Sequence, residues 1–337
     1  MNPISWSRRW AMPGTAMLLT LSLAGCGGNL GSEDSADSSV KFPDGPVTVA
    51  IGQDPGGSTD LIGRALAKIA TKELDAPMPV VNRPGANGAL AAQELAGKKA
   101  DGQNLMVINA SLNSISPLAV PADEAIDIND YEVVTGISED DYVLVTSSSS
   151  KYKSVKDLAG AGKKIDFATT GVGTGSQLSQ ELLFKQAKIP GSAVPFDGGS
   201  PSITAVLGKQ VDVASVQLGE AYPQIKAGKL RPIMVFSKER STFYPDTPTA
   251  VEEGYDIPVS QARAIAAPKG TPEATIKKLR ASFTTAFKDP GYKEFNKKGL
   301  LTPHEISGDE VVEEWTESRK TYKALVEKYD IELGQAE

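Results

Sequence analysis

A repeated unit of strand, glycine-rich loop and helix dominates the sequence from residue 46 onward and limits the folds that the chain can adopt. Each unit begins with a short apolar run, passes through a loop that contains glycines, and ends in an amphipathic helix. This alternation predicts a mainly parallel α/β sheet with helices on its faces. The clearest units are strand 47–51, loop 52–57 and a helix from Ser58; strand 165–168, loop 169–175 and a helix from Ser176; and strand 194–196, loop 197–199 and a helix capped by Ser200.

The three loops predict a binding edge of the sheet. In parallel α/β sheets, ligands bind outside the carboxyl ends of the strands, and each of these loops brings the N-terminus of a helix to such an end. Unpaired backbone N–H groups and the helix dipole favour an anion at that position. Glycine-rich turns occur in α/β proteins without a binding role, but three of them together favour a small carboxylate held mostly by backbone donors.

The N-terminal segment is typical of an export signal. Arg8 and Arg9 precede a short apolar run at 15–24, which is too short to cross a bilayer as a helix. The run ends in Leu-Ala-Gly-Cys, which resembles the bacterial lipobox. We therefore expect residues 1–25 to be a cleaved signal peptide and Cys26 to carry a lipid. The two arginines leave export by the Sec or the Tat route open.

Residues 26–42 are expected to combine the lipid anchor with a flexible tether, because this stretch is rich in Gly, Ser, Asp and Glu and has little to bury. No later segment approaches about 20 consecutive apolar residues. The sequence therefore predicts an extracytoplasmic protein that is attached to the membrane by lipid, at the cell surface or in the periplasm.

Composition excludes several classes of function. The formal net charge is -7 and the sequence pI is about 5.1, so the chain lacks the basic surface of a nucleic-acid-binding protein. One Cys and one His in the whole chain exclude disulfides, Cys/His zinc sites and mechanisms that need two imidazoles. We expect His304 to be a surface residue, and we expect no cofactor, no bound metal and no catalytic residue.

The last third of the chain is predicted to be helical. Thr271 and Pro272 are typical of a helix start, and Ser307 with Glu310 forms the sequence pattern of a capping box. The apolar face that follows, which includes Trp315, is interpreted as core.

In the helix that begins at Ser58, Asp60 and Arg64 stand four residues apart and are expected to pair with each other.

At this point the sequence resembles a known family, the Bug or TctC-type extracytoplasmic solute-binding receptors of tripartite tricarboxylate transport systems. The resemblance runs from about residue 43 to the end, and it rests on the order and spacing of several short motifs. These motifs are PGGSTD at 55–60, VNRPGANG at 81–88, TGVGTGS at 170–176, DGG at 197–199, GKQVD at 208–212, ERS at 239–241, PDTPT at 245–249 and APKGTP at 267–272.

The resemblance implies a two-lobed, periplasmic-binding-protein-like fold with a ligand cleft between the lobes. It places 43–143 with 262–337 in lobe one and 144–261 in lobe two, with the chain crossing near 142–146 and returning near 260–265. It also implies carboxylate binding by backbone amides and ordered water. The site residues carried over by position are Gly56, Gly57, Ser58 and Thr59 in lobe one, Thr170, Gly171, Gly173, Thr174, Gly175 and Ser176 in lobe two, and, as second choices, Asn87, Gly198 and Gly199.

Two departures from the family pattern concern specificity. The chain has Gly52-Gln53-Asp54 where relatives commonly have an aromatic residue, which suggests a more polar ligand. It also has Arg263 in the returning crossover, where relatives often have Trp and Gly. Arg263 is a hypothesised ligand contact, because a guanidinium can bind a carboxylate with two hydrogen bonds. The alternative is a solvated surface arginine.

The predicted function is capture of a small carboxylate and its delivery to a two-component membrane permease, by a receptor that is monomeric and is not an enzyme. The ligand class stays open among di- and tricarboxylates, acidic amino acids and aromatic acids. One alternative is a sensor that presents ligand to a membrane signalling partner. A weaker alternative is a dinucleotide-binding enzyme, because 171–176 follows a strand and Asp197 lies about 20 residues on. Against it, Ser176 stands where that motif requires its third Gly or Ala.

Overall fold

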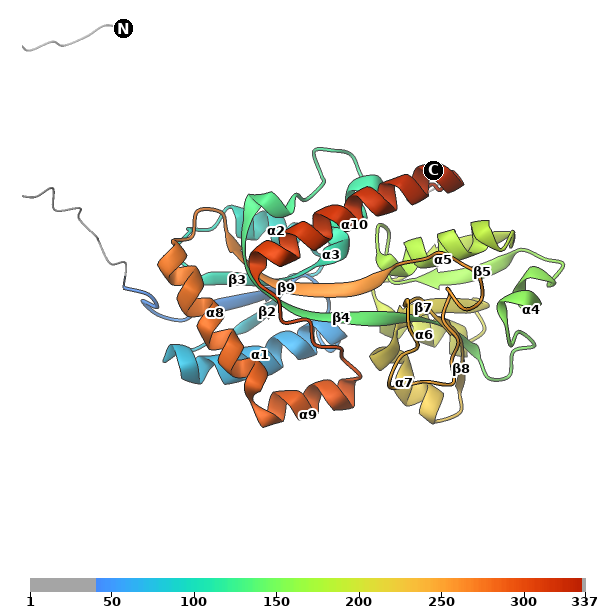
Figure 1. Cartoon of the computed structure of the whole chain (residues 1–337), viewed down its shortest axis with the longest axis horizontal. Coiled ribbons are helices and arrows are strands. Elements are labelled where there is room, and N and C mark those ends of the chain that lie inside the picture. Colours follow the sequence, from blue (N-terminus) through green and yellow to red (C-terminus); the bar gives the residue numbers. More distant parts are fainter. Residues whose placement is uncertain (1–40, 335–337) are drawn as a thin grey trace, which may run out of the picture. The chain divides into compact units, whose positions relative to one another are not determined.

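The computed structural model describes residues 41–334, and the following account concerns these residues. The predicted signal peptide, the predicted lipid site at Cys26 and nearly all of the predicted tether lie outside them. Two lobes share a nine-stranded sheet of order β2-β1-β3-β9-β4-β7-β5-β6, and β8 pairs with the free side of β4 (Figure 1).

Lobe one contains the first parallel strands. β1 pairs in parallel with β2 and with β3, and β3 pairs in antiparallel fashion with β9. Its elements are β1 (Thr48–Ile51), α1 (Ser58–Leu74), β2 (Val80–Asn82), the 3-10 turn η1 (Ala86–Gly88), α2 (Ala89–Ala96), β3 (Asn104–Asn109), α3 (Ala110–Ser114), η2 (Ser116–Leu118), η3 (Ile128–Asp130), β9 (Ser260–Pro268), α8 (Glu273–Lys288) and α9 (Pro290–Gly299).

Lobe two repeats this arrangement. β5 pairs in parallel with β6 and with β7, and β7 and β8 flank the second half of β4 in antiparallel fashion. Its elements are α4 (Val155–Ala159), β5 (Ile165–Thr169), α5 (Gly175–Gln186), β6 (Gly191–Pro195), α6 (Gly199–Leu207), β7 (Val213–Gln217), α7 (Leu218–Lys226) and β8 (Leu230–Val235).

Two strands join the lobes. β4 (Tyr131–Ser147) pairs with β9 up to Asp141 and with β7 and β8 from Tyr142 onward, so this one strand belongs to both halves of the sheet. The chain returns through β9, whose pairing with β4 begins at Ser260. The predicted crossing at 142–146 therefore coincides with the change of partners in β4, and the predicted return at 260–265 coincides with β9.

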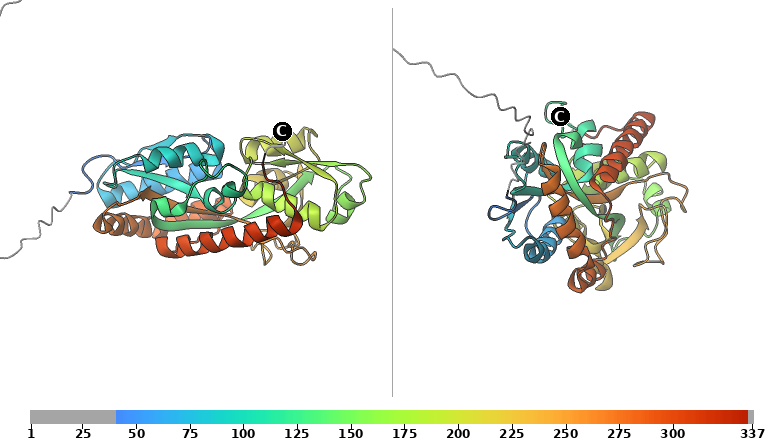
Figure 2. Two further views of the ribbon diagram at one scale, coloured as in Figure 1. Left: turned by 90° about the horizontal axis from the view of Figure 1, so that it is seen from above. Right: turned by 60° about the vertical axis from the view of Figure 1, so that its left-hand side comes forward.

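Each half of the sheet is covered on both faces (Figure 2). In lobe one, α1, α8 and α9 bury one face, and α2, α3 and the start of α10 (Gly308–Tyr329) bury the other. In lobe two, α4 and α5 cover one face, and α6 and α7 cover the other. These buried strands agree with the apolar runs in the sequence, since parallel strands with both faces covered are apolar throughout.

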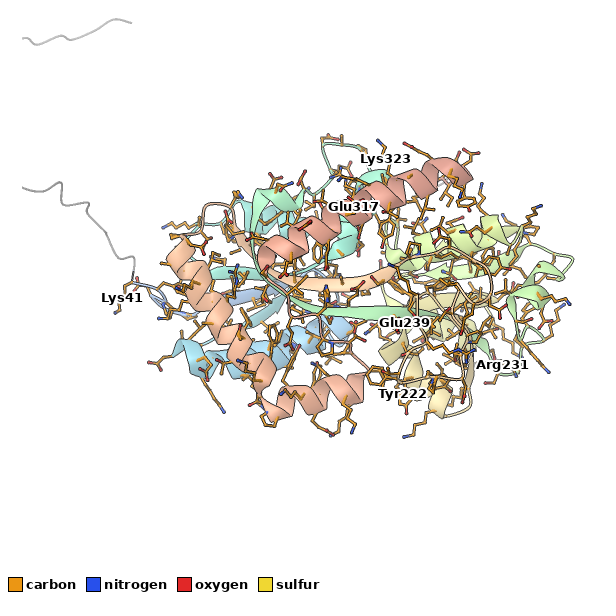
Figure 3. The ribbon with its side chains drawn as sticks, in the orientation of Figure 1. Lys41, Tyr222, Arg231, Glu239, Glu317 and Lys323 are labelled. Atoms are coloured by element: carbon orange, nitrogen blue, oxygen red, sulfur yellow. The ribbon has the colours of Figure 1, made fainter. Side chains whose placement is uncertain are left out.

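Helix α10 packs on both lobes. Trp315 lies in the lobe-one core, whereas Tyr322 and Leu325 lie in the lobe-two core against α5. The exposed Glu317 and Lys323 occupy its outer face (Figure 3). The apolar face is thus core, as predicted, but it is shared between two cores. The predicted division that assigns all of 262–337 to lobe one stays a prediction, and the packing of the second half of α10 does not follow it.

The N-cap residues of the helices can be compared with those predicted from the sequence. The capping box is confirmed: the Ser307 side chain accepts from the Glu310 amide, and the Glu310 carboxylate accepts from the Ser307 amide. The serine and threonine caps expected elsewhere are wrong by one or two residues, since the caps of α1, α5 and α6 lie earlier than predicted and the cap of α8 lies one residue later. The N-caps are Gly57 for α1, Thr174 for α5, Gly198 for α6 and Pro272 for α8.

Among the described helices, none combines the length and the apolar character that crossing a bilayer requires.

Replacing Ser307 with Ala is expected to lower the free energy of unfolding by about 1 kcal/mol, because the Glu310 amide at the start of α10 loses its side-chain acceptor. Urea denaturation followed by circular dichroism measures the change. Thr284→Ala, at an exposed position within α8, is the matched control and should stay within about 0.5 kcal/mol of the parent. Equal effects of the two substitutions would contradict the assignment.

Candidate functional site

The loops predicted to bind ligand follow β1, β5 and β6 at the carboxyl ends of these strands, and each leads into a helix. They deliver the N-termini of α1, α5 and α6 to the region where β4 and β9 join the two lobes (Figure 1). The first amides of each helix have no acceptor within the helix. The arrangement therefore presents backbone donors from both lobes to a common region.

The first loop is fixed by one buried carboxylate. Asp60, which is 2% exposed, accepts from the Gly56 amide at 2.9 Å, from Asn82 Nδ2 at 2.9 Å and from Arg64 Nε at 2.9 Å. The predicted pairing of Asp60 with Arg64 is confirmed. Burial acts to raise the pKa of Asp60, but the hydrogen bonds from Arg64, Gly56 and Asn82 outweigh it and lower the pKa. Asp60 thus orders the loop and leaves the helix terminus open.

Close packing between two loops explains why residue 52 is a glycine. A Cβ atom there would lie 2.5 Å from the Gly88 Cα, so the loops after β1 and β2 approach each other too closely for any side chain. The neighbouring Gln53 donates through Nε2 to the Asn87 carbonyl at 3.1 Å, and Asn87 Nδ2 donates to Ser111 Oγ at 3.1 Å. The missing aromatic residue is therefore replaced by a backbone contact that brings Asn87 beside the first loop.

Arg263 connects the first loop to the crossing strands. Its guanidinium forms an ion pair with Asp140 in which both side chains are 1% exposed. It also donates through Nε to Thr59 Oγ1 at 3.0 Å, through Nη2 to Ser58 Oγ at 2.8 Å and through Nη1 to Ser138 Oγ at 3.2 Å. The surface alternative for Arg263 is wrong. Its role as a ligand contact stays a prediction, and in this conformation it orients the two hydroxyl groups at the start of α1.

The sheet explains this burial. Arg263 lies in β9 between Asn109 of β3 and Ser138 of β4, so its side chain is surrounded by neighbouring strands. Burial raises the pKa of Asp140, and the charge of Arg263, the Thr302 amide and the Ser138 hydroxyl oppose this effect. The Thr302 amide donates to Asp140 Oδ1 at 2.8 Å. The carboxylate is thereby held by groups from three segments of the chain.

The second loop is braced mainly by its own side chains. Ser176 Oγ accepts from the Thr170 amide at 3.1 Å, and Gln177 Oε1 accepts from the Gly173 amide at 2.9 Å. Thr174 Oγ1 donates to the Gly171 carbonyl at 2.7 Å. The amides of Thr170 and Gly173 are therefore already used, and the donors left for a ligand are those at the first turn of α5.

Tyr142 packs directly on that first turn. A Cβ atom on Gly175 would lie 2.6 Å from the Tyr142 ring, so glycine is needed for this contact. The Tyr142 hydroxyl donates to Gln261 Oε1. Burial raises the pKa of Tyr142, and the nearby Glu220 carboxylate raises it further, whereas Arg263 lowers it. These effects place Tyr142, Arg263 and Glu220 in one electrostatic environment.

Glu220 links the first and third loops. It lies in α7 of lobe two, and its Oε1 accepts from the Ser58 amide of lobe one at 3.3 Å. A Cβ atom on Gly199 would overlap the Glu220 carboxylate, so this carboxylate also lies against the first residue of α6. Gly198 precedes it with a φ of 110°, a conformation that favours glycine. Ser58, Gly198 and Gly199 are thus gathered around one side chain.

The structure brings most of the predicted residues to this region and adds three that sequence reasoning missed. Gly56 is exposed, and its amide donates to Asp60 instead of facing the common region. Asn87 donates to Ser111 and lies beside the first loop. The residues missed are Asp140, Gln217 and Glu220. No local motif surrounds them, and only strand pairing and the meeting of the lobes reveal them.

Within residues 41–334, no group of three or more His, Cys, Asp or Glu side chains is arranged to hold a metal. His304 is half-buried, and its Nε2 lies 2.8 Å from Glu314 Oε2 of α10. The donors here are backbone amides and hydroxyl groups, which suit the binding of an anion.

Two lobes joined by crossing strands, with helix N-termini from both lobes facing one region, define a solute-binding receptor of the periplasmic-binding-protein type. Comparison with known proteins gives the family. The model of the TctC family, the tripartite tricarboxylate transporter family receptors, matches residues 62–331, and the chain belongs to this family. The resemblance predicted from the motifs is confirmed. The family consists of extracytoplasmic receptors rather than enzymes, so the dinucleotide-binding alternative is wrong.

The relatives cover most of the chain. A UPF0065 protein from the gbd 5′ region of Cupriavidus necator is 31% identical over 301 residues, which are 88% of this chain and 90% of the relative. Protein BugT of Bordetella pertussis is 29% identical and covers 81% of this chain and 86% of its own length.

Solved structures confirm the fold. A structure described as a periplasmic transporter superposes with a TM-score of 0.81 at 28% identity and covers 87% of this chain and 99% of its own. MatC from Rhodopseudomonas palustris, solved with bound malate, superposes with a TM-score of 0.79 at 26% identity and covers 85% of this chain and 100% of its own.

Asp60→Asn is expected to destabilise the protein at pH 7 by about 1–2 kcal/mol, because the Gly56 amide and Arg64 lose a charged acceptor. Since the pKa of Asp60 is lowered in the folded state, its contribution is present above the unfolded pKa of about 4. The contribution is lost as the pH falls through the lowered folded pKa. Urea denaturation at pH 7 and pH 3 should therefore show a smaller difference at pH 3 than at pH 7. Asp123→Asn, an exposed position, is the control, and a difference that does not shrink as the pH is lowered would contradict the linkage.

Arg263→Met is expected to destabilise the protein by about 3–5 kcal/mol, because it leaves Asp140 buried without its cation. The double variant Asp140→Leu/Arg263→Met removes both charges and should recover at least about 1 kcal/mol of that loss. Denaturant unfolding of both single variants and of the double variant gives the coupling. Additive losses would show that the pair does not act as a unit.

Proposed function

We propose that this protein captures a small carboxylate between its two lobes and delivers it to a two-component membrane permease. One observation carries the proposal: the Ser58 amide at the start of α1 already donates across the lobes to a carboxylate oxygen, that of Glu220. A ligand carboxylate has the same chemistry and fits the same donor. Amides at the first turns of α5 and α6 supply further donors from the opposite lobe.

The comparison with MatC supports the ligand class, since that relative was solved with bound malate. Among the residues predicted from the motifs, the proposed contacts are Ser58 and Thr59 at the start of α1, Gly175 and Ser176 at the first turn of α5, and Gly198 and Gly199 at the start of α6. The amides of Gly56, Thr170 and Gly173 are bonded within their own loops. Binding from both sides would stabilise the closed arrangement of the lobes, which a membrane partner can then recognise.

The proposed partner follows from the family, whose receptors are described as parts of a tripartite transporter. A permease is therefore favoured over the signalling partner of the sensor alternative. We also propose that lipid on Cys26 holds the monomeric receptor at the outer side of the membrane, next to that permease.

Thermal unfolding of the purified protein with a panel of acids tests the ligand class. The panel contains citrate, malate, succinate, aspartate, glutamate and benzoate, with NAD as the negative control. A ligand at about a thousand times its dissociation constant adds roughly 4 kcal/mol of stability. A shift with at least one carboxylate is expected. A shift with NAD and with no acid would contradict the proposal.

Ser58→Pro tests the backbone donor. Ser58 is the first residue of α1, and Gly57 before it is extended with a ψ of 165°, so proline fits the backbone and removes the amide hydrogen. Loss of a hydrogen bond to a charged ligand is expected to weaken carboxylate binding by about tenfold or more in isothermal titration calorimetry. Ser58→Ala keeps the amide and serves as the matched control. Equal affinity in the two variants would show that this amide does not bind ligand.

A further inference from the structure

Glu220 brings a negative charge to a site that is built to bind anions. Its carboxylate stands between the Ser58 amide of α1 and the first residue of α6. It projects from α7, the helix that carries the labelled Tyr222 (Figure 3). Arg263, the nearby cation, is already paired with Asp140. Among the ion pairs of the described residues, none joins a cation to Glu220. The site residues therefore carry a net negative charge.

A buried amide near the start of α7 has no partner in the described structure. Gln217, the residue at the start of α7, is 3% exposed, and neither its Oε1 nor its Nε2 has a hydrogen-bond partner in the described structure. It pairs in register with Tyr142, so the two side chains leave the same face of the sheet next to each other. A buried amide with both a free donor and a free acceptor can bond to a polar group of a bound molecule.

A ligand carboxylate at the start of α1 changes the surroundings of Glu220. It takes the Ser58 amide, which is the donor that Glu220 uses in this structure. Glu220 is then left next to the bound anion in a region from which the closed lobes exclude water. Like charges at short range in such surroundings repel strongly, and a desolvated carboxylate without a partner is costly. A cationic group on the ligand removes both penalties.

We propose that Glu220 is the specificity-determining residue of this site and that it selects carboxylates that also carry an ammonium group over carboxylates of the same length that lack one. This inference rests on the proposed function and names the ligand class within it. In the bound state, the ligand carboxylate binds the amides of α1, and the ligand ammonium donates to Glu220. The free Oε1 of Gln217 is a second acceptor for the same group.

Two pairs of ligands isolate the ammonium group: aspartate with succinate, and glutamate with glutarate. In the pair whose length fits the site, calorimetry on the purified protein is expected to show that the amino acid binds at least about tenfold more tightly than the diacid. The diacid has no ammonium group and therefore cannot form the charge-assisted hydrogen bond to Glu220. Glu220→Gln keeps the shape and an acceptor for the Ser58 amide but removes the charge. It should reduce this preference about tenfold or more and leave the melting temperature without ligand unchanged within about 2 °C.

Glu253→Gln, at an exposed position of lobe two, is the control for total charge and should keep the preference of the parent. A preference that is unchanged in Glu220→Gln overturns the inference and leaves the proposed function standing. Equal weakening of all four ligands, which a purely structural role predicts, overturns it as well. Equally tighter binding of all four ligands by Glu220→Gln also overturns it, because that result is expected if Glu220 only competes with the ligand for the Ser58 amide. If no acid of either panel binds the parent protein, the proposed function fails, and this inference fails with it.

Discussion

The buried ion pair between Arg263 and Asp140 holds together the parts of the structure on which the site depends. The two residues lie in the strands that join the lobes, and the guanidinium extends from this pair to the hydroxyl groups of Ser58 and Thr59. A buried charge of either sign alone would be costly, so each residue requires the other. The pair thereby ties the geometry of the crossing strands to the position of the first helix terminus. A shift of Arg263 or Asp140 at the junction of the lobes would therefore move the hydroxyl groups at the start of α1.

Around this pair, the proposed site consists of backbone groups and contains no unpaired cationic side chain among the residues described for it. Side chains that could have bound a ligand are used for bracing instead: Asp60 holds the first loop, and Ser176 and Gln177 hold the second. This division of roles leaves the first amides of α1, α5 and α6 as donors whose positions are fixed before any ligand arrives. Preorganised donors cost little entropy on binding. Specificity then depends on the few side chains that remain, of which Glu220 carries the charge.

Much of the fold could be predicted from local patterns, because alternating strands and helices, the capping box of α10 and the pair Asp60–Arg64 each depend on residues close in sequence. Motif resemblance added the crossing strands, which periodicity alone does not reveal. The helix caps were wrong by one or two residues because α1 and α6 begin after a glycine that has no side-chain cap, and α5 is capped by Thr174 instead of Ser176. Asp140 and Glu220 could not be found, since their partners lie 123 and 162 residues away in the chain. Gly52 was interpreted as a lost aromatic residue, whereas its role is a contact with Gly88.

The path of α10 across both cores limits how the lobes can move. Its first half is anchored by Trp315 and its second half by Tyr322 and Leu325, and beyond it the Leu333 carbonyl accepts from Gln177 of α5 at 3.2 Å. Pulling the lobes straight apart would expose the side chains on one half of this helix. Rotation about an axis near β4, β9 and α10 keeps both anchors buried, because displacement grows with distance from the axis. The parts of each lobe that lie farthest from this axis then move most, so α10 defines the line about which the lobes rotate.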